Sequence, residues 1–530
     1  MRSSKMIRGA ACAASLLIAA CGESDSRFDL VLVHEDCETA TGESVLPVSG
    51  TVRISIVGDG IGAPIVGTAD VASRSLQVPD VPVGSNRVAT VEVCDDGATC
   101  NVVRAWGRSA PFDVSDSDTP TVEVQMFRVN GFTRTRAPGG ACSDMGTVRA
   151  GHTATRLQDG RVLLAGGFRL LVSDLANDVL QSAEIFDPAT GVFSAVPDMC
   201  VDGTCLPRAF GQAVRLLDGR VLIAGGVDET GEPTASAILF DPKANAWTAA
   251  PSMAHARHGH TATLLEAAGG RVVIVGGVDA EGVVREEIEV FDRGAFSVLQ
   301  GGAGGLLLPR AFHSAAVVGT TPRAVQVVGG IGADGKVQAS SRVVSYSRDS
   351  GTFTTGPTTS DVLEVGVASA GIAPFSKRLA VVAGASKWSL EGPTPGLGTG
   401  REPIREIQWF DRPEGSGDRG TVPGQMARIS PCVVMLGEDD ARTPDDRALV
   451  IGGFAANGIT PLTKAEVIGW RGEVLASSLT DNQGRLRDDG GRGYATCTNL
   501  GDGRILVSGG IGSGNKAVPT AEIYVARGAD

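Results

Sequence analysis

Six arginines occupy matching positions in the sequence, each at the head of a similar stretch of small, apolar and hydroxyl-bearing residues. They are Arg149, Arg208, Arg257, Arg310, Arg428 and Arg492, and Glu364 stands where a further arginine would fall. A guanidinium group forms paired hydrogen bonds with a carboxylate, so a cluster of these side chains could bind an acidic ligand. In a second interpretation, each arginine pairs with an acidic residue of its own or the next segment and fixes the ends of strands. The residue types leave both interpretations open.

Histidines and glutamates recur in the same segments. His152, His260 and His313 hold equivalent places, but a metal ion would need them to converge to within about 2.0–2.1 Å of one point. Residues repeated at one position of separate units need not converge, so packing is the favoured role and no metal site is predicted. The recurring glutamates are Glu184, Glu289, Glu406, Glu466 and Glu522. Their repetition indicates a structural hydrogen bond in each unit, and we predict no catalytic residue because no paired carboxylates stand out.

Each of these segments predicts a β-hairpin, as the stretch Gly151 to Gly167, GHTATRLQDGRVLLAGG, illustrates. Residues 152–157 alternate at period two, Asp159-Gly160 is a two-residue turn signal, and residues 162–165 are a buried apolar run. Gly166-Gly167 then ends the second strand where a Cβ would crowd a neighbouring backbone or a positive φ is needed.

The hairpin recurs along the chain. Its copies span residues 208–226, 257–277, 310–330, 365–385, 428–453 and 492–510, with first glycines at 166, 225, 276, 329, 384, 452 and 509. After each glycine pair come a variable loop, a third strand ending in an aromatic residue, and a fourth strand with an aromatic residue at Phe193, Trp247, Phe296 or Phe353. A period near fifty residues indicates a repeat architecture. Four antiparallel strands that can be buried only against neighbouring repeats predict one blade of a β-propeller per repeat.

The paired glycines, the DGR turn and the downstream aromatic residue together resemble the kelch-repeat β-propellers, including their galactose-oxidase-like branch. The resemblance covers roughly residue 128 to the C-terminus and implies a seven-bladed propeller. It also implies that the first residues of the inner strands lie near one mouth of a central channel, where the six arginines would form a broken ring able to bind an acidic glycan or peptide. The resemblance says very little about function, because kelch propellers include binding modules, scaffolds and a few enzymes.

The enzyme relative that the resemblance suggests, galactose oxidase, holds copper with two tyrosines and two histidines. This chain has 3 Tyr, namely Tyr346, Tyr494 and Tyr524. Tyr494 stands where the family has Tyr-His, but Ala495 follows it, and no histidine follows His313. A copper-radical site is therefore not expected, and no cofactor is predicted. Residues 347–353, SRDSGTF, resemble a damaged sialidase Asp-box, but we favour their reading as the turn between two strands of blade four.

The two ends of the propeller are expected to meet in one blade. The last repeat supplies three strands, over residues 492–500, 504–508 and 521–525. VNGFTRT, residues 129–135, has strand character and an aromatic residue at Phe132, so we predict that it is the fourth strand of blade seven. Blade five carries an insertion, Lys387 to Pro403, whose Gly and Pro content predicts an irregular surface loop that is either a binding element or a tolerated excursion.

Residues 1–20 are typical of an export signal, because Arg2, Lys5 and Arg8 precede a short apolar run. The sequence Ile18-Ala19-Ala20-Cys21 resembles the bacterial lipoprotein signal, in which cleavage leaves Cys21 as a lipidated N-terminus. An ordinary secretory peptide with a chance cysteine is the alternative. The lipoprotein interpretation places the protein in the bacterial cell envelope, with the outer membrane favoured by Gly22. Residues 21–27 would then be a tether, and the lipid would be the expected membrane anchor.

Residues 28–127 carry strand patterns of a different kind from the propeller, which is assigned to residues 128–530. Alternating segments separated by Gly, Pro, Asp and Asn turns lie at residues 28–33, 50–58, 69–78, 86–94, 101–109 and 120–127. This spacing predicts an immunoglobulin-like or transthyretin-like β-sandwich.

The net charge indicates which partners to expect, and the cysteine content indicates the compartment. Lys plus Arg number 47 against 60 Asp plus Glu, for a net charge of -13, so nucleic acid is not an expected partner. Of 10 cysteines, Cys12 lies in the signal and Cys21 would carry lipid, which leaves an even number for disulfides in an oxidising compartment. The pairs Cys94–Cys100 and Cys200–Cys205 close short loops and are predicted disulfides. Zinc is the competing interpretation, but these spacings lack the CxxC form.

A third disulfide, Cys432–Cys497, is predicted from strand parity. Counting the leading arginine of each inner strand as the first residue, Cys432 is the fifth and Cys497 the sixth, so the two side chains point to opposite faces of their own blades. Adjacent blades pack front to back, so the sulfurs can meet if the Cα atoms lie within about 7 Å.

Together these features predict a monomeric lipoprotein of the cell envelope with an N-terminal β-sandwich and a seven-bladed kelch-like propeller. It is expected to bind a protein or glycan ligand at a propeller face and not to be an enzyme. The alternative is a carbohydrate-active enzyme of the galactose-oxidase-like or sugar-epimerase kind.

Overall fold

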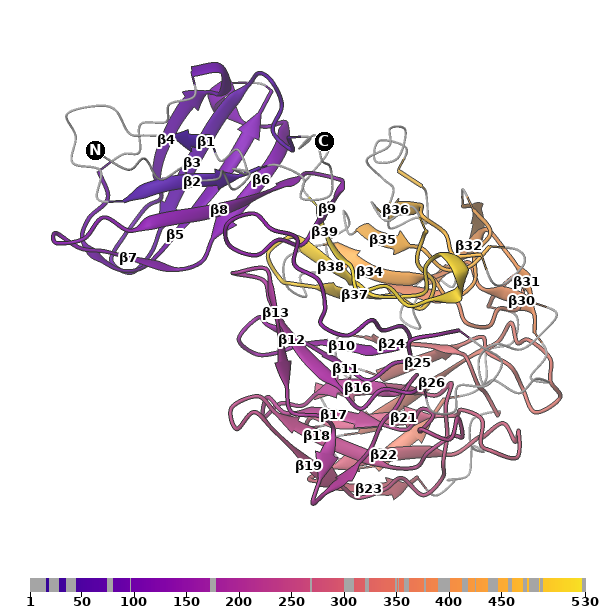
Figure 1. The fold of residues 1–530 in the computed structure, drawn as a ribbon. Coiled ribbons are helices and arrows are strands. Elements are labelled where there is room, and N and C mark those ends of the chain that lie inside the picture. The colour runs from indigo at the N-terminus through magenta and orange to yellow at the C-terminus, as the bar shows by residue number, and fades with distance from the viewer. Residues whose placement is uncertain are drawn as a thin grey trace, which may run out of the picture. The chain divides into compact units, whose positions relative to one another are not determined.

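The structure is a computed structural model of the 530-residue chain. It describes residues 16–18, 28–34, 44–73, 80–95, 97–171, 178–266, 269–299, 309–319, 324–347, 350, 352–356, 362–375, 378–388, 401–411, 418–424, 426–436, 447–455, 460–469, 474–475, 486 and 490–526. The chain forms two compact units (Figure 1). One consists of Met1–Asp144, Pro188–Val192 and Ile523–Asp530, and the other of Met145–Asp187 and Phe193–Glu522. Both are built of strands, and the described part of the chain has no helix long and apolar enough to cross a membrane.

The N-terminal strands form one eight-stranded sheet that curves as a half-barrel. Its strands are β1 (Leu16–Ile18), β2 (Asp29–Val33), β3 (Thr51–Val57), β4 (Ile65–Asp70), β5 (Gly84–Cys94), β6 (Val103–Ser109), β7 (Phe112–Val114) and β8 (Thr121–Arg128). They follow the order β1-β2-β8-β6-β5-β3-β4, with β7 paired to β5 and with β2 parallel to β8. Alternate residues such as Val52, Ile54 and Ile56 enter one hydrophobic core, which confirms the predicted all-β character.

One strand of this sheet begins before the segment expected for it. β4 covers Ile65–Asp70, whereas the sequence pattern suggested residues 69–78, of which residues 74–78 lie outside the described part of the chain. The Asp70 carboxylate accepts a hydrogen bond from the Ala72 backbone N–H at 2.7 Å, and the 3₁₀ turn η1 (Val71–Ser73) follows directly. A side chain that bonds its own backbone two residues on favours a turn over continued strand pairing, so the strand ends there.

The propeller consists of seven antiparallel sheets, as predicted. Blade one contains β10 (Thr153–Arg156), β11 (Val162–Ala165), β12 (Ala183–Asp187) and β13 (Val192–Val196); blade two contains β16 (Gln212–Arg215), β17 (Val221–Ala224), β18 (Ala237–Asp241) and β19 (Ala246–Ala250); and blade three contains β20 (Thr261–Leu265), β21 (Arg271–Val275), β22 (Ile288–Asp292) and β23 (Ala295–Val298). Blade four contains β24 (Ser314–Val318), β25 (Ala324–Val328), β26 (Ser341–Ser347) and β27 (Thr352–Thr355), and blade five contains β28 (Gly371–Pro374), β29 (Arg378–Val382), β32 (Glu406–Asp411) and β33 (Arg419–Pro423). Blade six contains β34 (Cys432–Leu436), β35 (Arg447–Ile451) and β36 (Ala465–Gly469), and blade seven contains β37 (Thr496–Asn499), β38 (Arg504–Ser508), β39 (Ala521–Val525) and β9 (Phe132–Arg134). Of the Asp-box-like residues, Ser347 ends β26, Thr352 and Phe353 belong to β27, and Arg348, Asp349 and Gly351 lie outside the described residues.

The seventh sheet has the order β37-β38-β39-β9, which confirms that residues near 132 complete it. Asn130 N–H donates to the Val525 carbonyl at 2.8 Å. The rings of Phe132 and Tyr524 lie 5.1 Å apart. The same third-to-fourth-strand aromatic pair occurs in blades one to four, at 4.8 to 5.0 Å, as Phe186–Phe193, Phe240–Trp247, Phe291–Phe296 and Tyr346–Phe353. The earliest segment of the repeat region therefore fills the place that an aromatic fourth strand fills elsewhere.

The glycine pairs join each blade to the next. The N–H of the second glycine donates to the carbonyl of the residue that leads the following inner strand, for example from Gly277 to Arg310 at 2.8 Å. The last of these bonds, from Gly510 to Arg149 at 2.9 Å, closes the ring. A Cβ on the first glycine would overlap that same carbonyl, which explains why glycine recurs there. In blade five the lost glycine is the first of the pair, because Ala383 holds its place at φ 58° and Gly384 makes the bond to Arg428.

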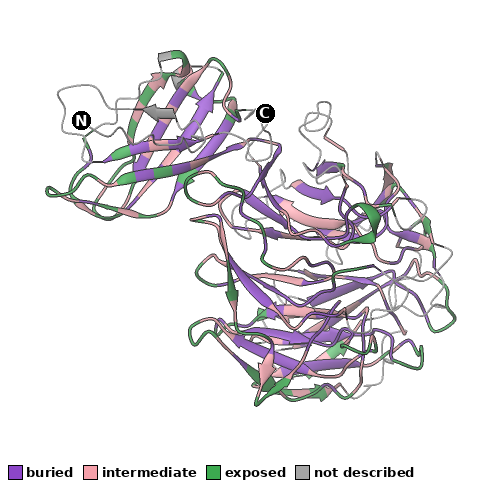
Figure 2. Cartoon of the chain, viewed as in Figure 1, coloured by how far each residue is buried: buried purple, intermediate pink, exposed green. Residues whose placement is uncertain are grey.

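The propeller core is a series of layers between neighbouring blades, and the second and third strands of each blade are its most buried parts (Figure 2). The layer between blades two and three, for instance, joins Leu222 and Leu239 to Val272 and Ile274. Burial of apolar surface between blades supplies most of the stabilisation of such a repeat fold.

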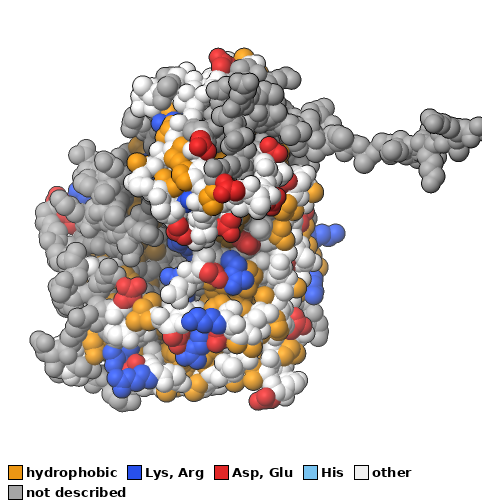
Figure 3. Space-filling view, turned by 90° about the vertical axis from the view of Figure 1, so that its left-hand side faces the viewer, with side chains coloured by type: hydrophobic (Ala, Val, Ile, Leu, Met, Phe, Trp, Pro, Cys, Tyr) orange, Lys and Arg blue, Asp and Glu red, His pale blue; other side chains and the backbone are white. Residues whose placement is uncertain are grey.

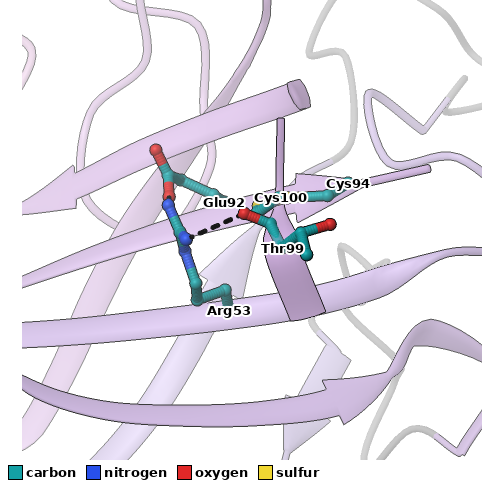
Figure 4. Close-up of a disulfide and its surroundings, with 5 residues drawn as sticks. All are labelled: Arg53, Glu92, Cys94, Thr99 and Cys100. Atoms are coloured by element: carbon teal, nitrogen blue, oxygen red, sulfur yellow. Dashed lines mark hydrogen bonds and ion pairs between the residues drawn. A yellow bond between two sulfur atoms is a disulfide. The ribbon is translucent and has the colours of Figure 1, made fainter. Parts of the chain in front are cut away.

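All three predicted disulfides are present. Cys94–Cys100 closes the turn after β5, where Arg53 pairs with Glu92 and Nη1 of Arg53 lies 3.5 Å from the Thr99 carbonyl oxygen (Figure 4). Cys200–Cys205 joins β14 (Cys200–Val201) to β15 (Thr204–Cys205), and Cys432–Cys497 joins β34 to β37. Cys142 is also disulfide-bonded. Cys37, Cys21 and the tether lie outside the described residues.

Candidate functional site

The six leading arginines are buried inside their blades, with 0 to 2% of each residue exposed. In five of them Nη1 donates to the carbonyl of the first glycine of the same blade, as from Arg257 to Gly276 at 2.7 Å. The arginine side chain therefore holds the glycine loop of its own blade, while its backbone carbonyl accepts the bond from the preceding blade. This corrects the expectation of an exposed arginine ring at the channel mouth, because these guanidinium groups have no surface to offer a ligand.

Four of the arginines are paired with buried glutamates. The Nη2–Oε1 distances are 2.6 Å for Arg149–Glu184, 2.6 Å for Arg257–Glu289, 2.5 Å for Arg428–Glu466 and 2.8 Å for Arg492–Glu522. Glu289 also accepts the Ala254 backbone N–H at 2.8 Å. Burial lowers the pKa of Arg257, and the charge of Glu289 opposes that shift. The arrangement agrees with the interpretation in which each arginine pairs with an acidic residue of the repeat.

Blade five departs from this pattern, and two sequence assignments change with it. Gln408, not Glu406, holds the glutamate place on the third strand, and its side chain bonds both the N–H and the C=O of Val365 at 2.9 Å. Val367, not Glu364, holds the arginine place, because its carbonyl accepts the N–H of Gly330. An amide thus replaces the ion pair in this blade.

Blades two and four hold their arginines with serines. Arg208 bonds Ser236 Oγ at 3.0 Å, and Arg310 bonds Ser340 Oγ at 2.6 Å. Burial lowers the pKa of each to about 10. The charge of Arg342 acts in the same direction on Arg310. Both groups remain protonated at neutral pH, so these two blades carry positive charge close to the channel.

A ring of seven residues lies two positions after the residue that leads each inner strand. Its members are Gly151, Phe210, Gly259, Phe312, Ser369, Ser430 and Tyr494, all with φ between 51° and 63°. Backbone hydrogen bonds link neighbours in the ring, such as Phe210 N to Gly151 O at 2.8 Å and Gly151 N to Tyr494 O at 3.0 Å. A left-handed conformation costs a non-glycine residue of the order of 1–2 kcal/mol, and five members are not glycine. We call these seven residues the channel ring.

Every member of the channel ring lines one cavity of about 380 Å³. Other lining residues include Gln212, Thr261, Thr496 and Trp388. The rings of Phe210 and Tyr494 meet edge to face at 5.2 Å, and Phe312 stacks on Trp388 at 5.2 Å. The cavity therefore presents aromatic faces together with hydroxyl and amide groups.

Trp388 reaches the cavity from the insertion in blade five. The described ends of that insertion pair as β30 (Ala385–Lys387) and β31 (Glu402–Pro403), and residues 389–400 lie outside the described part. Trp388 is 5% exposed, and its Nε1 has no hydrogen-bond partner among the described residues. Arg401 lies over its ring, with Cζ 4.8 Å from the centroid. Burial raises the pKa of Tyr494, and the charge of Arg401 and a hydrogen bond from it oppose that rise.

The recurring histidines pack between blades and line the same cavity. His152 Nε2 lies 3.0 Å from Thr496 Oγ1, and His313 Nε2 lies 2.8 Å from Thr261 Oγ1. A Cβ on Gly509 would come within 2.9 Å of the His152 ring, so the first glycine of the preceding blade also makes room for the imidazole. Burial lowers the pKa of His258 and His313 to about 3, and that of His152 and His260 well below its usual range. These imidazoles are neutral at physiological pH.

The structure adds residues that sequence reasoning missed. Phe210, Phe312, Ser369 and Ser430 carry no motif, and only their shared offset from the leading residue could have singled them out. Trp388 is the one tryptophan of the insertion, and this feature of the sequence could have indicated its role.

Comparisons with known proteins agree with this architecture. The Kelch motif matches residues 208–254. The chain carries a kelch motif on a seven-bladed β-propeller. No curated protein matches this chain in sequence.

Solved structures with a similar fold include the structure of YjhT, at 14% identity and a TM-score of 0.45, which covers 63% of this chain and 98% of that one. A fungal alcohol oxidase of the AA5 family in complex with copper is 14% identical, with a TM-score of 0.50, and covers 72% of this chain and 75% of that one. The likeness to the oxidase concerns the fold alone.

The described residues of the propeller do not form the ligand set of such a copper centre. The described residues contain no group of three or more His, Cys, Asp or Glu side chains that could hold a metal ion. Tyr494 lines the cavity but is followed by Ala495, and the Nε2 atoms of His152 and His313 are engaged by threonine hydroxyls on different blades.

Proposed function

We propose that the kelch propeller is a ligand-binding module and that its ligand enters the cavity bordered by the channel ring. The observation that carries this proposal is the set of three aromatic side chains, Phe210, Phe312 and Tyr494, held in left-handed conformations around that cavity. Glycine would adopt this backbone without strain, as it does at two ring positions. Strained residues that persist at a cavity are characteristic of binding sites.

The size and chemistry of the cavity support a small ligand. Small-molecule sites in proteins typically occupy about 300–1,000 Å³ and combine apolar walls with a few polar groups. The hydroxyl and amide groups of Thr261, Thr496 and Gln212 suit a polyhydroxylated ring, and the aromatic faces suit its apolar side. We therefore propose one sugar unit, or the end of a glycan, as the ligand.

Binding is tested with a glycan and monosaccharide panel on the purified protein and on Phe210→Gly. This variant removes an aromatic wall and relieves the backbone strain, so the thermal midpoint should change little while affinity falls at least tenfold. Thr230→Gly, in an exposed loop of the same blade, is the matched control and should bind like the parent. Equal affinity in Phe210→Gly would exclude the cavity as the site.

The same panel distinguishes binding from turnover. A binding module returns every sugar unchanged, whereas the alternative, a carbohydrate-active enzyme, releases an oxidised or epimerised product. Product formation that Phe210→Gly abolishes would replace the binding proposal with the enzymatic one.

We further propose that the mature protein begins at Cys21, without β1 (Leu16–Ile18), and is anchored in the cell envelope by a lipid on that cysteine. The support is the sequence around the cysteine, in which Ala19-Ala20 precede Cys21 after an apolar run. Cys21→Ser should release the protein from the membrane fraction, and Cys12→Ser should leave it there. Retention of Cys21→Ser with the membrane would contradict this anchor.

A further inference from the structure

We propose that the cavity recognises an anionic group of its ligand, a carboxylate, through Arg401 and the indole N–H of Trp388. The inference rests on the proposed function and specifies the ligand class.

Arg401 is placed to meet such a group. Its guanidinium lies over the Trp388 ring at 4.8 Å and donates a hydrogen bond to the hydroxyl of Tyr494. Both aromatic residues line the cavity, so the cation stands beside two of its walls. A guanidinium presents five N–H donors, so one bond to Tyr494 leaves further donors for a ligand carboxylate.

Trp388 supplies a second donor. Its Nε1 is buried at the cavity and makes no hydrogen bond within the described part of the chain. An indole N–H can only donate, and a buried donor without a partner is unfavourable until an acceptor arrives. A carboxylate is an acceptor-only group, so it satisfies this atom better than a hydroxyl does.

The charges around the cavity favour an anion over a cation. The residues found to line it include His, Ser, Thr and Gln but no Asp or Glu, and the histidines are neutral. Arg208 and Arg310 stand two residues before Phe210 and Phe312 and are held by serines instead of carboxylates. Their uncompensated charge adds to that of Arg401, since buried charges are weakly screened. A cationic ligand would meet repulsion here despite the aromatic walls.

Matched pairs of neutral and acidic sugars test the inference by calorimetry. The probes are galactose with galacturonate and glucose with glucuronate. We expect each acid to bind at least tenfold more tightly than its neutral partner, and Arg401→Gln to abolish that preference. Arg405→Gln makes the same charge change at an exposed residue of the same blade and should keep the preference.

A second measurement needs no sugar. The difference in fluorescence between the parent and Trp388→Phe isolates the emission of Trp388, which is then quenched with iodide, caesium or neutral acrylamide. We expect iodide to quench this emission more strongly than caesium, and Arg401→Gln to remove the difference.

The outcomes separate the two proposals. Equal binding of neutral and acidic sugars, or equal quenching by iodide and caesium, would overturn the carboxylate inference and leave the cavity as a binding site. Preferential quenching by iodide without binding of any sugar in the panel would support the anion site and contradict the sugar ligand.

Discussion

At the scale of single residues, the buried arginine–glutamate pairs are built into the blades as supports for backbone. Arg257 binds the carbonyl of Gly276, and Glu289 binds the N–H of Ala254, so the pair ties the glycine loop to the segment before the inner strand. Side chains of both charges also lie on the surface, and the face shown in Figure 3 carries Lys and Arg as well as Asp and Glu. The two settings differ in dielectric, because a surface pair is screened by water and a buried one is not.

Removal of the glutamate from a buried arginine–glutamate pair should therefore lower the stability of the protein far more than removal of an accessible carboxylate. Glu289→Ala leaves the charge of Arg257 buried and unpaired, and should lower the free energy of unfolding by about 3–5 kcal/mol. Glu406→Ala, the matched change at a half-buried residue, should lower it by less than about 1 kcal/mol. Urea unfolding followed by tryptophan fluorescence measures both, and similar losses in the two variants would refute the support role.

The buried histidines predict a loss of stability in acid. His313 stays neutral in the folded protein down to about pH 3, whereas in the unfolded chain it takes up a proton near pH 6.5. The unfolded state therefore binds more protons between these values, and stability falls as the pH is lowered from 6.5 toward 3.

The variant His313→Gln removes that proton uptake. Its free energy of unfolding should depend less steeply on pH over this window, by up to about 1.4 kcal/mol per pH unit. Urea midpoints at pH 7, 6 and 5 give the slope. A slope identical to that of the parent would show that His313 titrates normally in the folded state.

At the scale of elements, the glycine pair is the joint between blades. Its first member brings two backbones into contact, and its second member makes the hydrogen bond that repeats around the ring. Positive φ alone would not require this arrangement, because other glycines of the chain have positive φ in open turns.

Two glycine-to-alanine changes separate backbone strain from crowding at the joint. At Gly276 the added Cβ meets the Arg310 carbonyl and the His313 ring, whereas at Gly282, in a turn with φ 76°, it meets nothing within 4 Å. Gly282→Ala should lower the free energy of unfolding by about 1 kcal/mol, from strain alone. Gly276→Ala should lower it by more than about 3 kcal/mol, and equal thermal midpoints for the two variants would disprove the crowding.

At the scale of the whole molecule, the closed ring is secured near its seam by three kinds of contact. Gly510 bonds Arg149, β9 adds to β39, and Cys432–Cys497 links the inner strands of blades six and seven. A closed propeller needs such links because the strands of its last blade come from the two ends of the repeat region.

The disulfides should differ in their contribution according to the loop that each closes. Cys432 and Cys497 are 65 residues apart, and Cys200 and Cys205 are 5 apart. On a chain-entropy basis, the Cys432→Ser/Cys497→Ser variant should lose roughly 4 kcal/mol and the Cys200→Ser/Cys205→Ser variant roughly 2 kcal/mol. Thermal unfolding under oxidising conditions compares them. A larger loss in the short-loop variant would contradict this order.

The sequence by itself determined the number of blades, the closing strand and the disulfides. Hairpin turns, glycine pairs and third-strand aromatic residues are local signals, and strand parity decides which face carries Cys432 or Cys497. Only the tertiary structure decided which side chains border the channel. The leading arginines turn back into their blades, and the left-handed residue two positions later exposes Phe210, Phe312 or Tyr494 instead. A periodic pattern gives the position of a residue in its repeat, but burial and charge compensation depend on the neighbouring blades that surround it.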